Sequence, residues 1–253
     1  MKEMKNMPNI VQIATKDILY YEESKEEKLL NFCDDHNIDR LPSYNGKYKY
    51  IKREDKFQKK EIKEKETLKA SKGSLDSQVM EKFSEEEFIF VYRNNELMGI
   101  AYFCDYNSGV IYEHLYQRIY ELETDIRELL RKENLDSSDM VEFIEQHPIF
   151  EKSSKRHDPE NIKSHRPFQN SNLSELVNFL HDRSEFSLKI DQSNLTDLRN
   201  KVMHEKQFVE HNDHQEDSMD YDPETFKDFR RMVRVLSESE SKVRNHIKLK
   251  EMD

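Results

Sequence analysis

The second half of the chain repeats apolar residues at the spacing of a helix. From residue 110 onward they recur every three or four positions, which places them on one face of an amphipathic helix that ends near Lys132. The members of this stripe are Leu115, Ile119, Leu122, Ile126 and Leu129. Such a helix needs partners, which four later segments with helical patterns can supply: Met140–Ile144, Leu173–Leu180, Leu195–His204 and Phe226–Leu236. The pattern predicts a helical bundle.

The sequence also indicates where helices of this bundle begin and which segments connect them. Two of the helices have recognisable starting residues, Asn172 with Glu175 and Asp222 with Pro223. Residues 151–169 are rich in Lys, Ser, His and Pro, and residues 209–221 are rich in His and Asp. We expect both segments to be exposed loops.

The first part of the chain shows a different pattern, in which a helix, a strand, a tight turn and a second strand occur twice. The first unit has a capping box and an Asn-Gly turn, and its parts are Ser24 with Glu27, Ile38–Pro42, Asn45-Gly46 and Lys47–Ile51. The second unit has a polar turn between two apolar runs, and its parts are Val79–Phe83, Phe88–Tyr92, Asn94-Asn95 and Leu97–Phe103. Lys52–Gly73, between the units, interleaves Lys with Glu, and we interpret it as a charged connector or a frayed helix.

Residues 8–109, with these paired units, resemble a CBS domain pair, in which two βαβ-like halves pack pseudo-symmetrically. The clearest likeness is Gly99-Ile100-Ala101-Tyr102-Phe103-Cys104-Asp105, which is similar to the closing strand and turn of that family. The resemblance implies that Gly99 permits close approach and that Asp105 accepts hydrogen bonds from the ribose hydroxyls of an adenine nucleotide. Tyr102 stands where the family usually has Thr or Ser, and residues 46–55 match less well. Two alternatives stay open, a nucleotide-sensing site and a structural or dimerising module.

Composition agrees with a helix-rich globular protein. Of 253 residues, 37% are charged, only four are Gly and none is Trp, while 14 Phe and 12 Tyr argue against general disorder. The predicted fold class is an α+β CBS-like pair at 1–109 followed by an all-α bundle at 110–253, predominantly helical overall. The net charge of -11 argues against non-specific binding of nucleic acid, so any RNA activity needs a local basic patch.

Neither a membrane segment nor a thiol site is expected. Residues 1–15 lack the apolar run of a signal peptide, and no apolar stretch of about 18 residues could span a bilayer. We therefore expect a cytoplasmic protein. Cys33 and Cys104 are isolated, without the close spacing of a zinc or redox site, and we expect two reduced thiols.

The most specific chemistry lies in the fourth predicted helix of the bundle. It contains the hexapeptide Arg199-Asn200-Lys201-Val202-Met203-His204. At about 100° per residue, Asn200 and His204 lie on one helix face and Arg199 lies one step round. The opposite face is apolar and is expected to point into the core, through Leu195, Leu198 and Val202.

This hexapeptide resembles the signature of HEPN domains. Tyr120–Leu130 is similar to the opening helix of many such domains, and the likeness extends over roughly residues 110–248. The resemblance implies that two copies pair about a two-fold axis with their polar trios facing one another. It also implies a ribonuclease that requires no metal and no other cofactor.

Metal-independent RNA cleavage places three demands on these side chains. A ribose 2′-OH attacks the adjacent phosphorus, so the site must help to remove a proton, stabilise a pentacovalent phosphorane and protonate the leaving 5′-oxygen. We assign proton transfer to His204, phosphate stabilisation to Arg199 and orientation by hydrogen bonding to Asn200. The products would carry a 2′,3′-cyclic phosphate and a 5′-OH. In the alternative interpretation, His204 only caps its helix and Arg199 pairs with Asp197 or another acid.

Four neighbours are candidates for supporting roles. Glu123 and Arg127 are four residues apart on the opening helix, so they form either a local ion pair or a second layer that orients Arg199 or His204. Lys201 and Lys206 either contact RNA phosphates or are solvated surface residues.

Other chemical motifs are weaker. Several histidines and one aspartate in the expected loops lack the spacing of a metal site. They are His211, Asp213 and His214 in one loop and His157 and His165 in the other. No phosphate-cradling glycine loop and no Gly-x-Ser-x-Gly elbow occurs in the sequence.

The leading hypothesis is an endoribonuclease of the kind found in toxin and anti-phage systems. Its HEPN-like half cuts RNA, and its CBS-like half dimerises, senses a ligand or restrains the cleavage. The competing hypothesis is a non-catalytic module that senses an adenine nucleotide and dimerises or docks a partner. A third is that a partner nucleotidyltransferase modifies the Arg-to-His segment. Expected partners are RNA, a second copy of the chain and an antitoxin or other defence protein.

Overall fold

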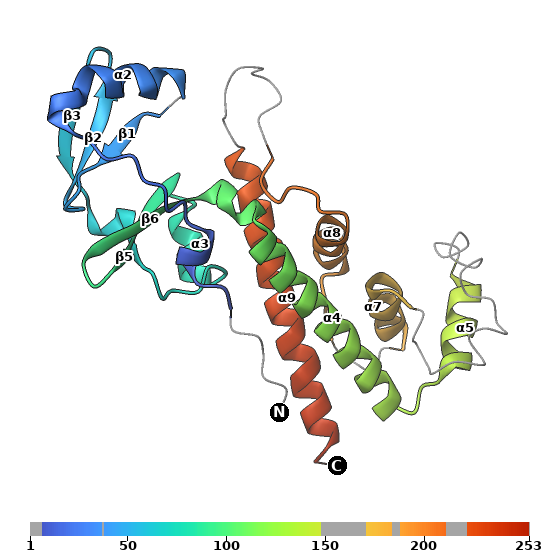
Figure 1. The fold of residues 1–253 in the computed structure, drawn as a ribbon. Helices are drawn as coiled ribbons and strands as arrows, with labels where there is room; N and C mark the ends of the chain where they lie inside the picture. Colours follow the sequence, from blue (N-terminus) through green and yellow to red (C-terminus); the bar gives the residue numbers. More distant parts are fainter. Residues whose placement is uncertain (1–6, 37, 148–170, 184–187, 211–221, 253) are drawn as a thin grey trace. The chain divides into compact units, whose positions relative to one another are not determined.

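The computed structural model describes residues 7–36, 38–147, 171–183, 188–210 and 222–252, which belong to two compact units (Figure 1). The first unit comprises Met1–His114 and Gln207–Arg230, and the second comprises Leu115–Lys206 and Arg231–Asp253. The expected division after residue 109 lies close to the first boundary. Residues 207–230, which were expected in the helical domain, pack instead with the first unit.

A three-stranded antiparallel sheet opens the first unit. Its order is β1 (Arg40–Pro42), β2 (Tyr48–Arg53) and β3 (Lys56–Glu61), and helices α1 (Ile10–Ile13) and α2 (Glu26–Asp35) precede it. Helix α2 packs its apolar side on the sheet in a cluster that contains Leu29, Cys33, Leu41, Tyr21, Ile38 and Phe57. The helix, strand, turn and strand predicted within residues 24–51 are confirmed.

The start of α2 differs from the prediction. A 3-10 turn, η1 (Glu23–Lys25), leads into the helix, and the hydroxyl of Ser24 donates to the carboxylate of Glu22 at 2.7 Å. The predicted capping box of Ser24 and Glu27 is therefore wrong. Because Ser24 lies inside the 3-10 turn, its side chain does not cap the helix that follows.

The second sheet mixes parallel and antiparallel pairing. Strand β4 (Thr67–Lys69) runs parallel to β5 (Phe88–Arg93) with helix α3 (Ser77–Lys82) between them in the chain, and β6 (Glu96–Tyr102) returns antiparallel. The turn before β6 is confirmed at Asn94 and Asn95, which take the positive φ values of 51° and 67°. A 3-10 helix, η3 (Phe103–Asn107), follows.

Two expectations for this region are corrected. Lys52–Gly73 is no connector, because it contains β3, the 3-10 helix η2 (Glu64–Glu66) and β4. Every residue of β3 except Phe57 is exposed. Because this strand faces solvent, its composition is that of a charged linker, and the sequence pattern did not reveal it. Only the second sheet contains a βαβ unit, whereas the first is an antiparallel meander, so the expected pair of βαβ-like halves is wrong for the first half.

Several side-chain interactions join the part of the first unit that contains the first sheet to the part that contains the second, among them the guanidinium of Arg40 on β1, which lies 4.5 Å from the ring centroid of Phe88 on β5. The ammonium of Lys49 pairs with the carboxylate of Glu66, and these residues are only 7% and 5% exposed. The phenol of Tyr92 donates to the carbonyl of Gly46 at 2.5 Å. Gly46 has a φ of 64°, and a Cβ there would lie 3.0 Å from the Tyr92 ring, so the turn favours glycine.

The second unit is helical, as predicted. It is built from α4 (Gly109–Lys132), α5 (Ser137–Gln146), α7 (Leu173–Asp182), α8 (Gln192–Met203) and α9 (Pro223–Lys250), with α4 and α9 contributing residues to both units. All five positions of the predicted α4 stripe are fully buried. Asn172 and Glu175 form the predicted capping box, and Asp222 accepts the backbone N–H of Glu224 at the start of α9.

A buried ion pair fixes α4 against α9 in the second unit. Arg118 donates two hydrogen bonds to the carboxylate of Glu240, at 2.9 and 2.8 Å, and a third to the hydroxyl of Ser237 at 2.8 Å. The two side chains of the pair are 9% and 10% exposed. Farther along the same helices, Arg244 contacts Asp125 at 2.9 Å.

The expected loop 209–221 begins differently from the prediction. Phe208 and Val209 are fully buried in the first unit, where the Phe208 ring stacks on Phe229 and Tyr112 at 4.4 Å. The side chain of Asn107 holds this segment, since it accepts the backbone N–H of Phe208 at 2.8 Å. Residues 211–221 and the expected loop 151–169 lie outside the described residues.

None of the described helices is both long enough and apolar enough to cross a membrane.

We predict that Arg118→Met lowers the free energy of unfolding by about 3 kcal/mol, because it leaves the Glu240 carboxylate buried without its partner. Chemical denaturation measures the loss. The matched control is Arg234→Met, which breaks the exposed pair with Glu238 on α9 and should cost about 0.5 kcal/mol or less. Equal losses in the two variants would contradict the role given to the buried pair.

Candidate functional site

Helix α8 presents the motif residues at the edge of the helical core. Leu195, Leu198 and Val202 are buried, as predicted, and Asp191 caps the helix by accepting the backbone N–H of Asn194 at 3.2 Å. With this face fixed in the core, Arg199 and Asn200 fall at the boundary, and both are half-buried. The side chain of Asn200 makes no hydrogen bond to the described residues, so its amide is available to a ligand.

The end of α8 sets the position of the imidazole. His204 is the C-cap residue and is exposed. The next two backbone N–H groups turn back onto the helix, from Glu205 to Val202 at 3.4 Å and from Lys206 to Lys201 at 2.9 Å. This is the bonding of a Schellman motif, whose left-handed position is taken by Glu205 with a φ of 49°. The imidazole therefore leaves the helix where the chain reverses.

Glu123 connects the motif with the opening helix. Its carboxylate lies 3.3 Å from the guanidinium of Arg127 and 3.8 Å from Nε of Arg199, and its side chain is only 13% exposed. The sequence offered a local ion pair with Arg127 and a contact with Arg199 as alternatives for Glu123, and the structure shows both. The acid beside Arg199 is Glu123 and not Asp197, which the alternative interpretation had named first.

The Arg199 guanidinium is placed but incompletely bonded. Nε of Arg199 is buried and makes no hydrogen bond within the described part of the chain, since its 3.8 Å separation from Glu123 is beyond bonding distance. Glu123 thus lies beside two guanidinium groups, those of Arg127 and Arg199. Arg127 is fixed in turn by the carbonyl of Ser171 at 2.7 Å. Because Nε is enclosed by protein atoms, an anion would contact this guanidinium through its other two nitrogens, and the side chain as a whole is 28% exposed.

The two predicted phosphate-contacting lysines lie at the same helix end. Lys201 is half-buried within the last turn of α8, and Lys206 is exposed just after the Schellman turn. The basic groups near His204 thus come from one short segment.

Two exposed tyrosines on α4 were missed by the sequence reasoning. Tyr116 and Tyr120 are 50% and 52% exposed, unusual values for aromatic side chains. They are seven and three residues before Glu123, so all three lie on one face of α4. The sequence did contain a signal for them. Tyr116 and Tyr120 are four residues apart and lie next to the apolar stripe of α4, and they were assigned no role in the sequence analysis. Exposed aromatic rings near a basic patch can stack on unpaired bases.

Gly99 and Asp105, the residues that the CBS resemblance assigns to nucleotide binding, take part in packing and capping in this structure. The close approach at Gly99 is made by the chain itself, since a Cβ there would lie 2.9 Å from the carbonyl of Thr15. Asp105 accepts the backbone N–H of Tyr102 at 2.8 Å and caps η3. Burial raises the pKa of Asp105 to about 6. Gly99 and Asp105 therefore act here in packing and capping.

No metal centre is found in the part of the chain that the structure describes, where no three His, Cys, Asp or Glu residues gather to hold an ion. The loop residues considered for such a site lie outside the described ranges: His157, His165, His211, Asp213 and His214. Cys33 is buried and Cys104 half-buried, both as free thiols.

We predict that Asp105→Asn stabilises the protein at pH 7.5 by about 1 kcal/mol and has little effect near pH 4. The raised pKa means that the folded state holds the proton up to about pH 6. The stability that the protonated Asp105 carboxyl contributes to the folded state is therefore complete below about pH 4 and is lost as the pH rises through 6. Denaturation at both pH values, with the exposed Asp17→Asn as control, measures it. A stabilisation that is equal at both pH values would contradict the assignment.

Comparisons with protein-family models, with curated proteins and with solved structures find no match to this chain.

Proposed function

We propose that the second unit is a HEPN-type endoribonuclease that cleaves single-stranded RNA without a metal ion. The observation that carries the proposal is the placement of Arg199, whose buried, unbonded Nε lies 3.8 Å from Glu123 on the helix that ends in the exposed His204. A cation with spare donors and an exposed imidazole five residues later on the same helix are the two kinds of group that phosphodiester cleavage by the 2′-OH needs.

Each motif residue has one task in this reaction. The 2′-oxygen bonds to phosphorus as its proton passes to an imidazole, and the bond from phosphorus to the 5′-oxygen breaks as that oxygen receives a proton. His204 transfers protons, and Arg199 donates to the phosphate oxygens on which negative charge increases. Asn200 orients the phosphate through its amide. The RNA ends as a 2′,3′-cyclic phosphate and a 5′-OH.

The proposed site requires two copies of the chain. In an in-line displacement, the attacking 2′-oxygen and the leaving 5′-oxygen lie on opposite sides of phosphorus, so a single imidazole does not reach both. One His204 per chain therefore supplies the base and its counterpart supplies the acid. Pairing also doubles the local basic charge, which opposes the net charge of -11.

We predict that Arg199→Ala and His204→Ala each lower the rate of RNA cleavage by about a hundredfold or more, because each removes a group that acts on the transition state. Cleavage of a labelled unstructured RNA in EDTA measures the rate. His36→Ala, an exposed histidine in the first unit, is the matched control and should keep full activity. Unimpaired cleavage by a correctly folded His204→Ala protein would refute the catalytic assignment.

The exposed tyrosines on α4 support a preference for unpaired RNA. Tyr116 and Tyr120 share a face with Glu123, which contacts the motif, and stacking on an aromatic ring requires a base that is free of a duplex.

We predict that Tyr116→Ala with Tyr120→Ala weakens binding of unstructured RNA by about tenfold, because base stacking is lost. Fluorescence anisotropy in the His204→Ala background measures binding without cleavage. The matched Tyr→Phe pair keeps both rings and should bind as the parent does. If the alanine pair binds RNA normally but no longer dimerises by light scattering, then the tyrosines contact a second copy and the stacking role is wrong.

A second candidate is a binding or regulatory module without catalysis. The position of His204 at the helix C-cap favours it, because a capping imidazole needs no reaction to explain it. RNA that is bound but never cut would support this candidate. Intact mass after co-expression with a partner nucleotidyltransferase tests the third hypothesis, modification of the motif.

For the biological setting, we propose a cytoplasmic effector of a toxin or anti-phage system. Its cleavage would be held in check by an antitoxin or another partner protein until a trigger releases it. Co-expression of each neighbouring gene with the active protein, scored by recovery of cell growth, tests for such a restraint.

A further inference from the structure

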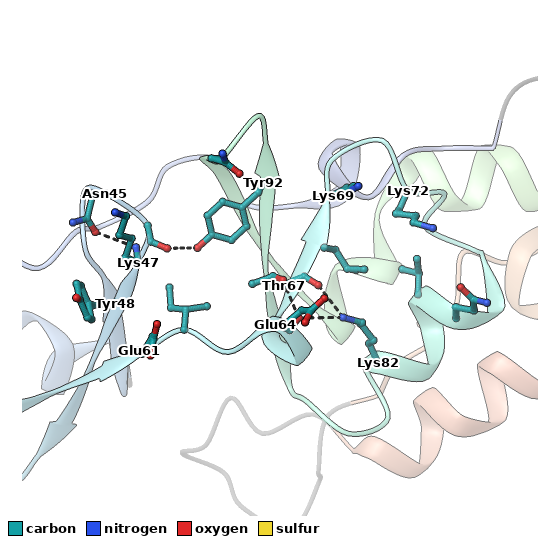
Figure 2. Close-up of a pocket in the computed structure, with 16 residues that line it drawn as sticks. Asn45, Lys47, Tyr48, Glu61, Glu64, Thr67, Lys69, Lys72, Lys82 and Tyr92 are labelled. Atoms are coloured by element: carbon teal, nitrogen blue, oxygen red, sulfur yellow. Dashed lines mark hydrogen bonds between the residues drawn. The ribbon is translucent and has the colours of Figure 1, made fainter.

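A cavity of about 690 Å³ lies between the two sheets of the first unit (Figure 2). Its walls come from the turn after β1, the end of β3, strand β4, helix α3 and the turn between β5 and β6. The hydrogen bond from Tyr92 to Gly46 closes one side, as the dashed line in Figure 2 shows. This volume is in the range of small-molecule sites in proteins.

The charge of the lining reverses that of the chain. Four lysines line the cavity against two glutamates: Lys47, Lys69, Lys72 and Lys82 against Glu61 and Glu64. The whole chain has a net charge of -11. A net positive cavity in an acidic protein attracts anions and is unfavourable for cations.

One of these positive charges is fixed in the wall. The half-buried ammonium of Lys82 donates to the backbone carbonyls of Thr67 at 3.0 Å and of Glu64 at 3.4 Å. Lys82 therefore contributes a stationary charge. The ammonium groups of Lys47, Lys69 and Lys72 are exposed and form no ion pair with the described residues. Their donors are free to reach a bound anion.

The floor of the cavity adds an apolar surface. Leu68 and Val79 line it and are buried, and Ile62 beside them is half-buried. Asn45, Gln78 and Asn95 provide amides around the rim. A phosphate group alone would leave the apolar floor unused, whereas a nucleotide has both phosphates and a flat, largely apolar base.

We propose that this cavity binds a phosphorylated small molecule of nucleotide size, with its phosphates among Lys47, Lys69 and Lys72 and its apolar part against Leu68 and Val79. The site is distinct from Gly99 and Asp105, neither of which lines the cavity. The cavity contains no residue of the ribonuclease motif, so a test of ligand binding here does not depend on whether the proposed cleavage occurs.

Titration calorimetry of the full chain at low ionic strength tests the proposal, with ATP, pyrophosphate, inorganic phosphate and adenosine as probes. ATP should bind most tightly, pyrophosphate and phosphate more weakly, and adenosine without measurable heat. The affinity for ATP should fall as salt is added. No binding of any phosphorylated probe, or adenosine binding as tightly as ATP, would overturn it.

Charge-reversal variants locate the site. Lys69→Glu with Lys72→Glu should weaken ATP binding by about tenfold or more, and so should Lys47→Glu on the opposite wall, because each places a negative charge beside the phosphates. The matched control is Arg53→Glu with Lys56→Glu, an exposed pair at the far end of the β2–β3 hairpin and outside the cavity. It should change the affinity by less than about twofold. Equal losses in control and test variants would show diffuse attraction only.

Discussion

The rotation of α4 about its own axis is the constraint on which the helical unit depends. Arg118 fixes it by donating two hydrogen bonds to the buried Glu240 of α9. Glu123 is five residues later and therefore about 140° round the helix, so it faces away from α9 and toward α8. A change in that rotation would move the carboxylate away from Arg199. The buried pair on one side of α4 thus sets the geometry of the motif on its other side.

Local patterns were sufficient to predict the helices of the second unit and four of the six described strands, β1, β2, β5 and β6. The apolar period predicted α4, α7, α8 and α9, and the core face of α8 followed from the same periodicity. Turn chemistry predicted the two asparagines before β6. For the site, the spacing of Arg199 and His204 and that of Glu123 and Arg127 were readable, because each pair lies on one helix.

Contacts between distant parts of the chain could not be predicted. Glu123 and Arg199 meet only because two helices pack, and no spacing in the sequence encodes that approach. The burial of Phe208 depends on Asn107, about a hundred residues earlier. Strand β3 was missed because its exposed charged residues have the composition of a linker, and it pairs with β2 through its backbone. The cavity requires both sheets and their bridging contacts.

We propose that two His204 imidazoles and the Arg199 guanidinium cleave RNA by attack of its own 2′-OH. The most direct test is to map both ends of the fragments produced from an unstructured RNA in the presence of EDTA, alongside the same RNA with a 2′-deoxy nucleotide at the cleaved position. The account predicts 2′,3′-cyclic phosphate and 5′-OH ends, with no cleavage at the deoxy position. A 5′-phosphate end, or cleavage that persists at the deoxy position, would contradict it.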